Sequence, residues 1–158
     1  MRRAYGRHMH GKFDDGGSRL GLKQIQDIVN STATQIGAEP ESLPTYGLSQ
    51  DFRRPHIEVD IAYHWIVKER GQVLEWRTTR DLDQLLYWVF SAATFGMACK
   101  FEVANRRAGQ DFRRLLFARQ LELLGSIRAD WRTTRLRELQ NVLSTSPFSD
   151  DGPPSLND

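Results

Sequence analysis

The spacing of hydrophobic residues along the chain changes twice, and each change predicts a different kind of element. Between residues 20 and 36 apolar side chains recur every three or four positions, which is typical of a helix, and Gly37 can end it. Residues 37–55 contain prolines and glycine and predict an irregular connection, with room for a short extended piece. From His56 onward the period is two, which indicates extended structure. Helical spacing returns after Asp81.

The extended region, residues 56–78, predicts a β-hairpin. One face of its long first strand would carry the apolar residues Ile57, Val59, Ile61, Tyr63, Trp65 and Val67. The other face would carry His56, Glu58, Asp60 and His64. Gly71 interrupts the pattern, and because glycine adopts positive φ freely, we expect it in the turn. Two strands are only marginally stable, so helices must cover their apolar face.

Three further helices are expected after the hairpin. The first begins at a cap formed by Asp81 and extends to about residue 107, before Gly109 ends it. Asp111 caps the next helix, which places Phe112 in the core and continues to Gly125. A last helix covers residues 130–143. The pattern predicts an α+β fold in which a β-hairpin, a small antiparallel sheet, is covered by about four helices, so that helix dominates.

The chain has 158 residues, which is the length of one ordinary domain. We expect a single domain at residues 20–148, a disordered or leader tail at 1–19 and a disordered tail at 149–158, because both ends are polar and lack periodicity. The net charge of +2 is too balanced to predict a nucleic-acid or membrane partner. A lone cysteine, Cys99, fits a reducing compartment, and so the cytoplasm.

Residues that could carry chemistry are few. His8 and His10 lie in the expected leader, and His56 and His64 would be roughly 26 Å apart on one strand at about 3.3 Å per residue, too far to share a metal ion. Cys99 lies in an apolar stretch, so we expect an unreactive thiol. We therefore expect no metal, no cofactor and no catalytic residues. An enzyme that uses Glu58 and Asp60 for acid–base work, with Glu69 or Arg70, is the alternative.

Aromatic and arginine residues are more numerous than such small elements can easily bury. Trp76 shares its predicted strand with the charged residues Glu75 and Arg77, and Tyr87 and Trp88 are adjacent on one helix. Binding hot spots are rich in tryptophan, tyrosine and arginine, so an interface is one explanation. A core that buries all of these residues between helices is equally compatible with the pattern.

Five segments follow one another in the order of a known family. They are His56–Asp60 (HIEVD), Tyr63–His64, Glu69–Gly71 (ERG), Arg80–Phe90 (RDLDQLLYWVF) and Gly109–Leu124 (GQDFRRLLFARQLELL). In these segments the chain resembles the immunity protein 63 family of bacterial polymorphic toxin systems, over about residues 56–148. The resemblance implies a small intracellular protein that binds a cognate toxin domain and neutralises it by stoichiometric occlusion, without catalysis.

The expected toxin-binding residues are the exposed aromatic and arginine side chains around the hairpin and its approach: Phe52, Arg53, Arg54, Arg70, Trp76 and Arg77. Gly71, Gly109, Asp111 and Phe112 are expected to be structural. Basic and acidic residues nearly balance, so an acidic imitation of nucleic acid is not expected. We expect neither a membrane nor a nucleic-acid partner. Besides the enzyme, a nucleic-acid-associated adaptor remains an alternative, and the oligomeric state is left open.

Overall fold

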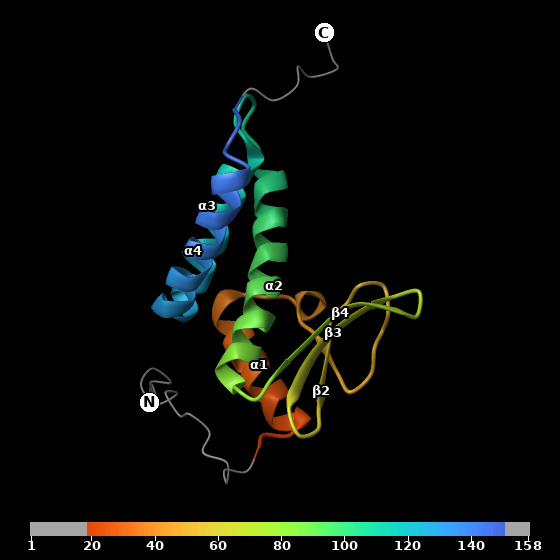
Figure 1. The fold of residues 1–158 in the computed structure, drawn as a ribbon. Coiled ribbons are helices and arrows are strands. Elements are labelled where there is room, and N and C mark those ends of the chain that lie inside the picture. Colours follow the sequence, from red (N-terminus) through yellow and green to blue (C-terminus); the bar gives the residue numbers. More distant parts are fainter. Residues whose placement is uncertain (1–18, 151–158) are drawn as a thin grey trace. The chain divides into compact units, whose positions relative to one another are not determined.

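A computed structural model describes residues 19–150 as two compact units. Of the described residues, unit 1 contains 19–30 and 43–89, and unit 2 contains 31–42 and 90–150. The elements, drawn in Figure 1, are α1 (Leu22–Ile36), the 3₁₀ helix η1 (Pro40–Ser42), β1 (Thr45–Tyr46), β2 (His56–Val59), β3 (Tyr63–Glu69), β4 (Gln72–Thr79), α2 (Leu82–Ala104), α3 (Phe112–Ile127) and α4 (Ala129–Thr145). The single domain at 20–148 stays a prediction. Residues 1–18 and 151–158 of the expected tails lie outside the described residues.

The predicted fold class is confirmed. Helix accounts for 56% of the described residues and strand for 16%. The sheet is larger than the predicted hairpin: within the described residues it has four strands in the order β1-β2-β3-β4, with β1 parallel to β2 and the other pairs antiparallel. The short strand β1 forms in the connection that we expected to be irregular.

The prediction that the hairpin has one long first strand is wrong. The chain reverses at residues 60–62, so that this segment forms two strands, β2 and β3. The Asp60 carboxylate accepts the Ala62 N–H at 2.9 Å, and the Asp60 N–H donates to the Ala62 carbonyl at 3.0 Å. Aspartate favours such turns because its short side chain can bond the backbone two residues on. Ile61, expected in the core, is 69% exposed at this turn.

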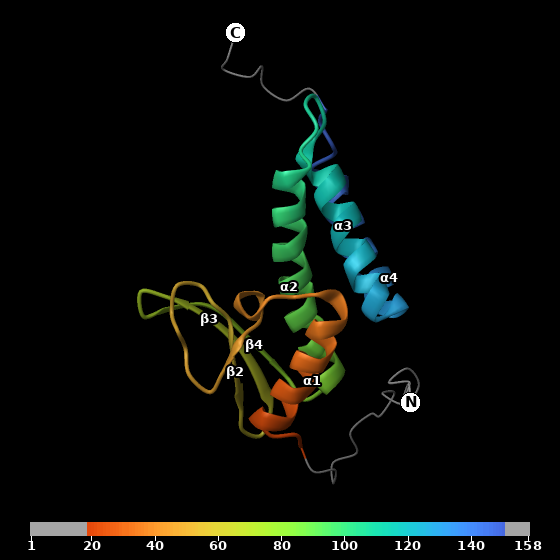
Figure 2. The same cartoon turned by 180° about the vertical axis from the view of Figure 1, so that it is seen from behind.

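The cross-strand register defines two faces of the sheet. Ile57, Tyr63 and Trp65 are buried on what we call the helix-side face. There Tyr63 Oη accepts the Leu20 N–H at 3.3 Å, just before α1, and the Arg77 guanidinium lies 5.6 Å from the ring of Trp88 in α2. The beginnings of α1 and α2 lie beside the sheet in Figures 1 and 2. Helices therefore cover this face, as predicted.

Unit 2 is built around a helical hairpin in which Arg128 alone separates α3 from α4. Trp131 of α4 stacks on Phe90 of α2, with ring centroids 5.9 Å apart. Gly125 was expected to end α3, but the helix continues to Ile127. A Cβ at Gly125 would lie 2.9 Å from Cδ of Arg132 in α4. Close packing of two helices, rather than a helix end, explains this glycine.

Candidate functional site

The β3–β4 turn forms one end of the sheet in unit 1. Glu69 pairs with Gln72, so that the turn consists of Arg70 and Gly71, with φ of 49° and 75°. Two positive φ values in a two-residue loop define a type I′ turn, whose twist matches that of the strands. The prediction that Gly71 has positive φ is confirmed.

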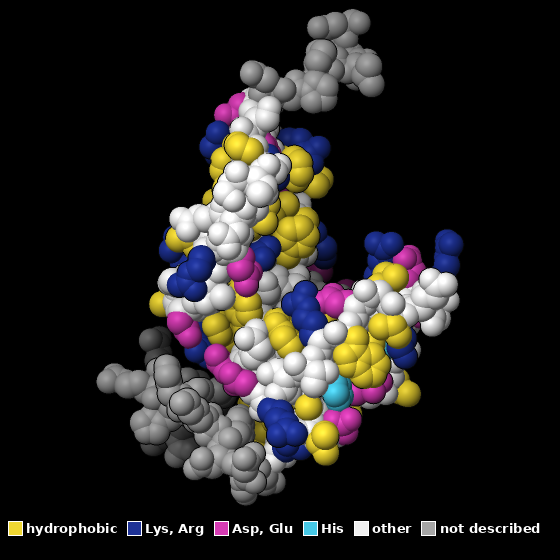
Figure 3. Space-filling model, in the orientation of Figure 1, with side chains coloured by type: hydrophobic (Ala, Val, Ile, Leu, Met, Phe, Trp, Pro, Cys, Tyr) yellow, Lys and Arg dark blue, Asp and Glu magenta, His cyan; other side chains and the backbone are white. Residues whose placement is uncertain are grey.

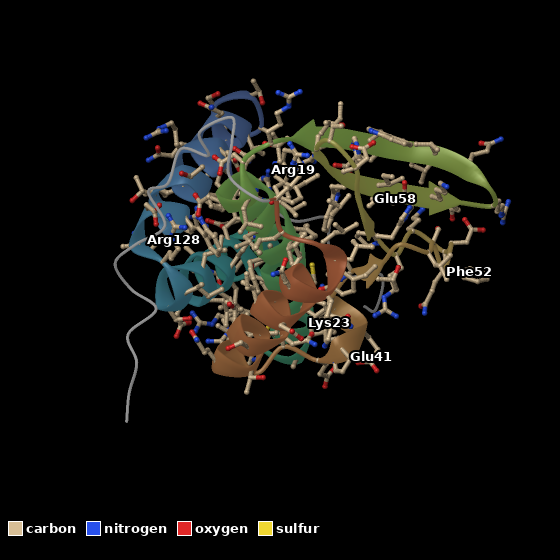
Figure 4. All side chains as sticks on the ribbon, turned by 90° about the horizontal axis from the view of Figure 1, so that it is seen from below. Arg19, Lys23, Glu41, Phe52, Glu58 and Arg128 are labelled. Carbon is tan, nitrogen blue, oxygen red and sulfur yellow. The ribbon has the colours of Figure 1, made fainter. Side chains whose placement is uncertain are left out.

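Residues 51–53 pack against this turn. The Asp51 carboxylate accepts the Gly71 N–H at 3.3 Å, and the Arg53 N–H donates to the Lys68 carbonyl at 2.8 Å. The Arg53 Nε donates to the Glu69 carboxylate at 2.7 Å. We call Asp51, Phe52, Arg53, Arg70 and Gly71 the hairpin end. Phe52, labelled in Figure 4, lies at this end of the sheet and is 89% exposed.

The backbone of the hairpin end is strained. Asp51, Phe52 and Arg53 have φ of 58°, 52° and 62°, and with Arg70 they are all the non-glycine residues of positive φ in the described chain. The left-handed conformation costs a residue with a side chain roughly 1–2 kcal/mol. Strain of this kind concentrates at binding and catalytic sites, where surrounding contacts maintain it. The hairpin end is therefore the first candidate for a functional surface.

The other three expected binding residues lie elsewhere. The Arg54 side chain turns back to the Leu43 carbonyl, at 3.1 Å, and to Gln50. Trp76 and Arg77 are consecutive in β4 and so point to opposite faces. Arg77 is on the helix-side face, where it pairs with Glu75 and lies over Trp88. The six residues do not form one surface, and the structure brings together only Phe52, Arg53 and Arg70.

A polar network crosses the opposite face of the sheet. His64 Nε2 lies 2.8 Å from the Asp60 carboxylate and its Nδ1 lies 2.8 Å from the Thr78 hydroxyl, which also accepts the Trp76 indole N–H at 3.2 Å. The hydrogen bond with His64 lowers the pKa of Asp60. In Figure 3 a histidine side chain is visible at the surface beside hydrophobic and acidic side chains. The network orients the half-exposed Trp76 ring, 5.6 Å from that of His64.

The prediction that both strand histidines are distant surface residues is wrong. Because the chain reverses after Val59, Glu58 lies directly opposite His64 on the same face as His56. His56 is fully buried, with its Nε2 2.9 Å from the Glu58 carboxylate. Its Nδ1 is buried without a hydrogen-bond partner in the described part of the chain.

The carboxylates of the enzyme alternative are held by neighbours. Glu58 contacts His56, Asp60 contacts His64, and Glu69 contacts Arg53. Burial raises the pKa of the Cys99 thiol, which disfavours the reactive thiolate. Between residues 19 and 150 no cluster of three or more histidine, cysteine or acidic side chains could hold a metal ion. No described helix has both the length and the apolar character that crossing a membrane requires.

The GQDFRR segment is used inside unit 2. Asp111 caps α3 as predicted, accepting the Arg113 N–H at 2.9 Å, and its carboxylate also binds the Arg113 guanidinium at 2.7 Å and the Ser149 N–H at 2.9 Å. Arg114 binds the Asp150 carboxylate at 2.8 Å. The Phe148 ring lies 4.4 Å from the Arg114 guanidinium and 6.0 Å from the ring of Phe117.

We call the set Asp111, Arg113, Arg114, Phe148 and Asp150 the clasp, since it fixes the chain after α4 to the start of α3. Its contacts lower the pKa of Asp111, chiefly through the hydrogen bond from Arg113. Arg113 forms an ion pair with Asp111, and Arg114 forms one with Asp150. Gly109, with φ of 72°, precedes the cap after α2 has ended.

The expectation that Phe112 belongs to the core is wrong. Phe112 is 51% exposed, because it is the first residue of α3 and the buried positions of this helix begin one turn later, at Leu116. Helical spacing of apolar residues predicted that Phe112 is buried together with the others. At the end of a helix, however, an apolar residue can lie beyond the neighbouring elements that bury the rest of that face.

A comparison with models of protein families identifies the family of this chain. The family model of immunity protein 63 matches residues 59–141, just over half of the chain. The chain belongs to the immunity protein 63 family. The family match includes the β3–β4 turn and the α3 end of the clasp, and leaves residues 51–53 outside. Its name indicates an immunity protein of toxin systems. Neither the curated proteins nor the solved structures gave a match.

Proposed function

We propose that this chain neutralises a cognate toxin domain by binding it one to one and occluding it, and that the hairpin end is the contact surface. Membership of the immunity protein 63 family supports the toxin partner. The observation that carries the choice of surface is that all four non-glycine residues of positive φ in the described chain lie at this end, and that one of them is an exposed phenylalanine.

Arg70 supports this choice of surface, because the turn position that it occupies favours other residue types. The first residue of a type I′ turn has positive φ, which asparagine, aspartate and glycine adopt most easily. An arginine there costs stability and exposes a guanidinium at the tip of the turn. A contribution to binding, rather than to folding, would account for this residue.

The chemistry of the hairpin end suits a protein partner. The Phe52 ring offers an apolar anchor, and Arg53 and Arg70 of the same hairpin end can each donate several hydrogen bonds to carboxylates or carbonyls. Arg53 is already oriented by Glu69, so that less side-chain freedom is lost on binding. The matching toxin surface would have an apolar pocket rimmed by acidic groups. Burial of such residues at an interface centre typically supplies most of the affinity.

The test is to titrate the toxin domain encoded beside this chain with purified Phe52→Ala and Arg70→Ala variants. Each should weaken binding by about 2 kcal/mol, roughly thirtyfold in Kd, and the double variant should lose protection in co-expression. Ile61→Ala and Arg80→Ala are matched controls, because both residues are exposed and lie outside the hairpin end.

Two results would contradict the proposal at different levels. If the controls and the hairpin-end variants bind equally well, the toxin contacts another surface. If the wild-type chain neither binds nor protects against the toxin, occlusion of that toxin is the wrong function.

A further inference from the structure

Strand β4 is an open edge of the sheet in unit 1. Within the described residues no strand lies beyond it, and six of its eight residues are exposed. Trp76, near its middle, is 55% exposed although Ile66, its partner on β3, is fully buried. An edge strand of this length with apolar side chains is a template for pairing with another strand.

Two main-chain hydrogen bonds show which groups of the sheet point toward this edge. The Ile57 carbonyl accepts the Gly47 N–H, so that Ile57 directs its main-chain groups away from β3. Main-chain direction alternates along a strand, so the residues on either side of Ile57 bond β3, at Ile66 and His64. Likewise, the Lys68 carbonyl points away from β4, toward Arg53.

Ile66 and His64 therefore use their main-chain groups on the β2 side. Their partners on β4 are Trp76 and Thr78, which consequently direct their own N–H and C=O groups toward the open edge. The irregularity in the β3–β4 pairing lies between Val67 and Lys68, and the register is regular from Glu75 to Thr79. Among residues 19–150, no strand uses these main-chain donors and acceptors of β4.

The charges around Trp76 are arranged symmetrically. Glu75 precedes it and Arg77 follows it, and both side chains are on the helix-side face. We propose that β4 pairs with β4 of a second copy of this chain, antiparallel and centred on Trp76. Each Glu75 then lies opposite Arg77 of the second copy, so that the strand is complementary in charge to itself.

The pairing satisfies the geometry of a two-fold symmetric contact. The two Trp76 residues form a hydrogen-bonded pair, each donating its N–H to the carbonyl of the other, and their rings meet across the strands. The axis is perpendicular to the sheet, so the helix-side faces of the two sheets continue into each other. The contact is isologous and therefore closes as a dimer. It also explains Trp76 and Arg77, which the hairpin end does not include.

The test exchanges the charges. Glu75→Arg places two arginines opposite two arginines, and Arg77→Glu places two glutamates opposite two glutamates. In sedimentation equilibrium the wild-type chain should dimerise reversibly, and each variant alone should dimerise roughly tenfold more weakly or not at all. A one-to-one mixture of the two variants should form a heterodimer, since every arginine then faces a glutamate.

The mixture distinguishes the contact between two chains from the Glu75–Arg77 ion pair within one chain. Mixing restores the opposite charges between the chains, but it does not restore the ion pair within either variant. The double variant Glu75→Arg/Arg77→Glu should dimerise like the wild type, and circular dichroism checks that all variants fold. A wild-type chain that stays monomeric at the highest concentrations would overturn the proposal. So would folded single variants that dimerise normally, or a mixture that remains monomeric.

Discussion

The hairpin end of unit 1 and the clasp of unit 2 contain the same kinds of residues in opposite circumstances. Each combines two arginines and a phenylalanine with aspartate, one at the hairpin end and two in the clasp. In the clasp the acid caps a helix, both guanidinium groups bind carboxylates, and the Phe148 ring is covered by arginine. At the hairpin end the Phe52 ring is exposed and the backbone is strained.

This difference shows that residue type alone does not distinguish a binding surface from a structural one. Arginine pairs in GQDFRR have the composition of a hot spot, but their donors are used within the chain. At the hairpin end Arg53 also binds a carboxylate, but the side chains of Phe52 and Arg70 are exposed. The distinction lies in which groups the fold leaves unused.

The two phenylalanines offer the largest expected contrast. Phe148→Ala should lower the free energy of unfolding by about 2 kcal/mol, because it removes a ring contact with Phe117 and the contact with the Arg114 guanidinium. Phe52→Ala should change stability by less than about 0.5 kcal/mol. Urea unfolding measures both. Equal losses would remove the distinction between clasp and hairpin end.

Of the two turns that join β2, β3 and β4, one could be predicted from the sequence and the other could not. The turn at Gly71 follows from a break in the alternation and from the backbone freedom of glycine. The turn at residues 60–62 was missed because Ile61 continues the alternation of apolar and polar positions. As a result, the proximity of His64 to Glu58 could not be predicted.

For the candidate site, the sequence could predict the types of residues but not their arrangement. Exposed arginine and aromatic residues near the hairpin could be selected by type, but their division between two faces requires the register of β4. Positive φ at Phe52 opposes the local preference of the residue, so it follows only from contacts of its neighbours with the β3–β4 turn. The clasp joins residues more than 30 positions apart, beyond the reach of any periodic pattern.

A second test concerns the rigidity of the hairpin end. Gly71→Val should destabilise the chain by about 1–2 kcal/mol, because a β-branched residue is strained at positive φ even though no atom would clash with its Cβ. Gln72→Val, one residue later in the strand, is the control and should have little effect, since valine favours strands. Thermal unfolding compares them. An unchanged melting temperature for Gly71→Val would contradict the turn geometry.

Arg70→Asn should separate folding from binding. Asparagine adopts the conformation of this turn position more easily, so we expect unfolding to require roughly 0.5 kcal/mol more, while toxin binding weakens as it does for Arg70→Ala. At the clasp, Arg114→Asn should instead lower stability, because Asp150 loses its ion pair and keeps only the hydrogen bond from the Asp111 N–H. A more stable chain that binds the toxin as tightly as the wild type would show that Arg70 is only a tolerated turn residue.

The smallest expected effect is that of the Asp111 charge, which is present at neutral pH and is lost on acidification. Its pKa in the folded chain is held below that of an ordinary aspartate by the hydrogen bond from Arg113 and by the Ser149 N–H. The folded state therefore favours the ionised carboxylate, and this contribution is complete above the ordinary aspartate range. It is lost as the pH falls from that range toward the lowered pKa, because the unfolded chain then binds more protons.

The melting temperature of the wild type should thus decrease toward that of Asp111→Asn over this interval. Asp27 forms an exposed ion pair with Lys23, and the melting temperature of Asp27→Asn should change with pH as that of the wild type does. If the gap between wild type and Asp111→Asn stays constant with pH, the charge of Asp111 does not hold the clasp.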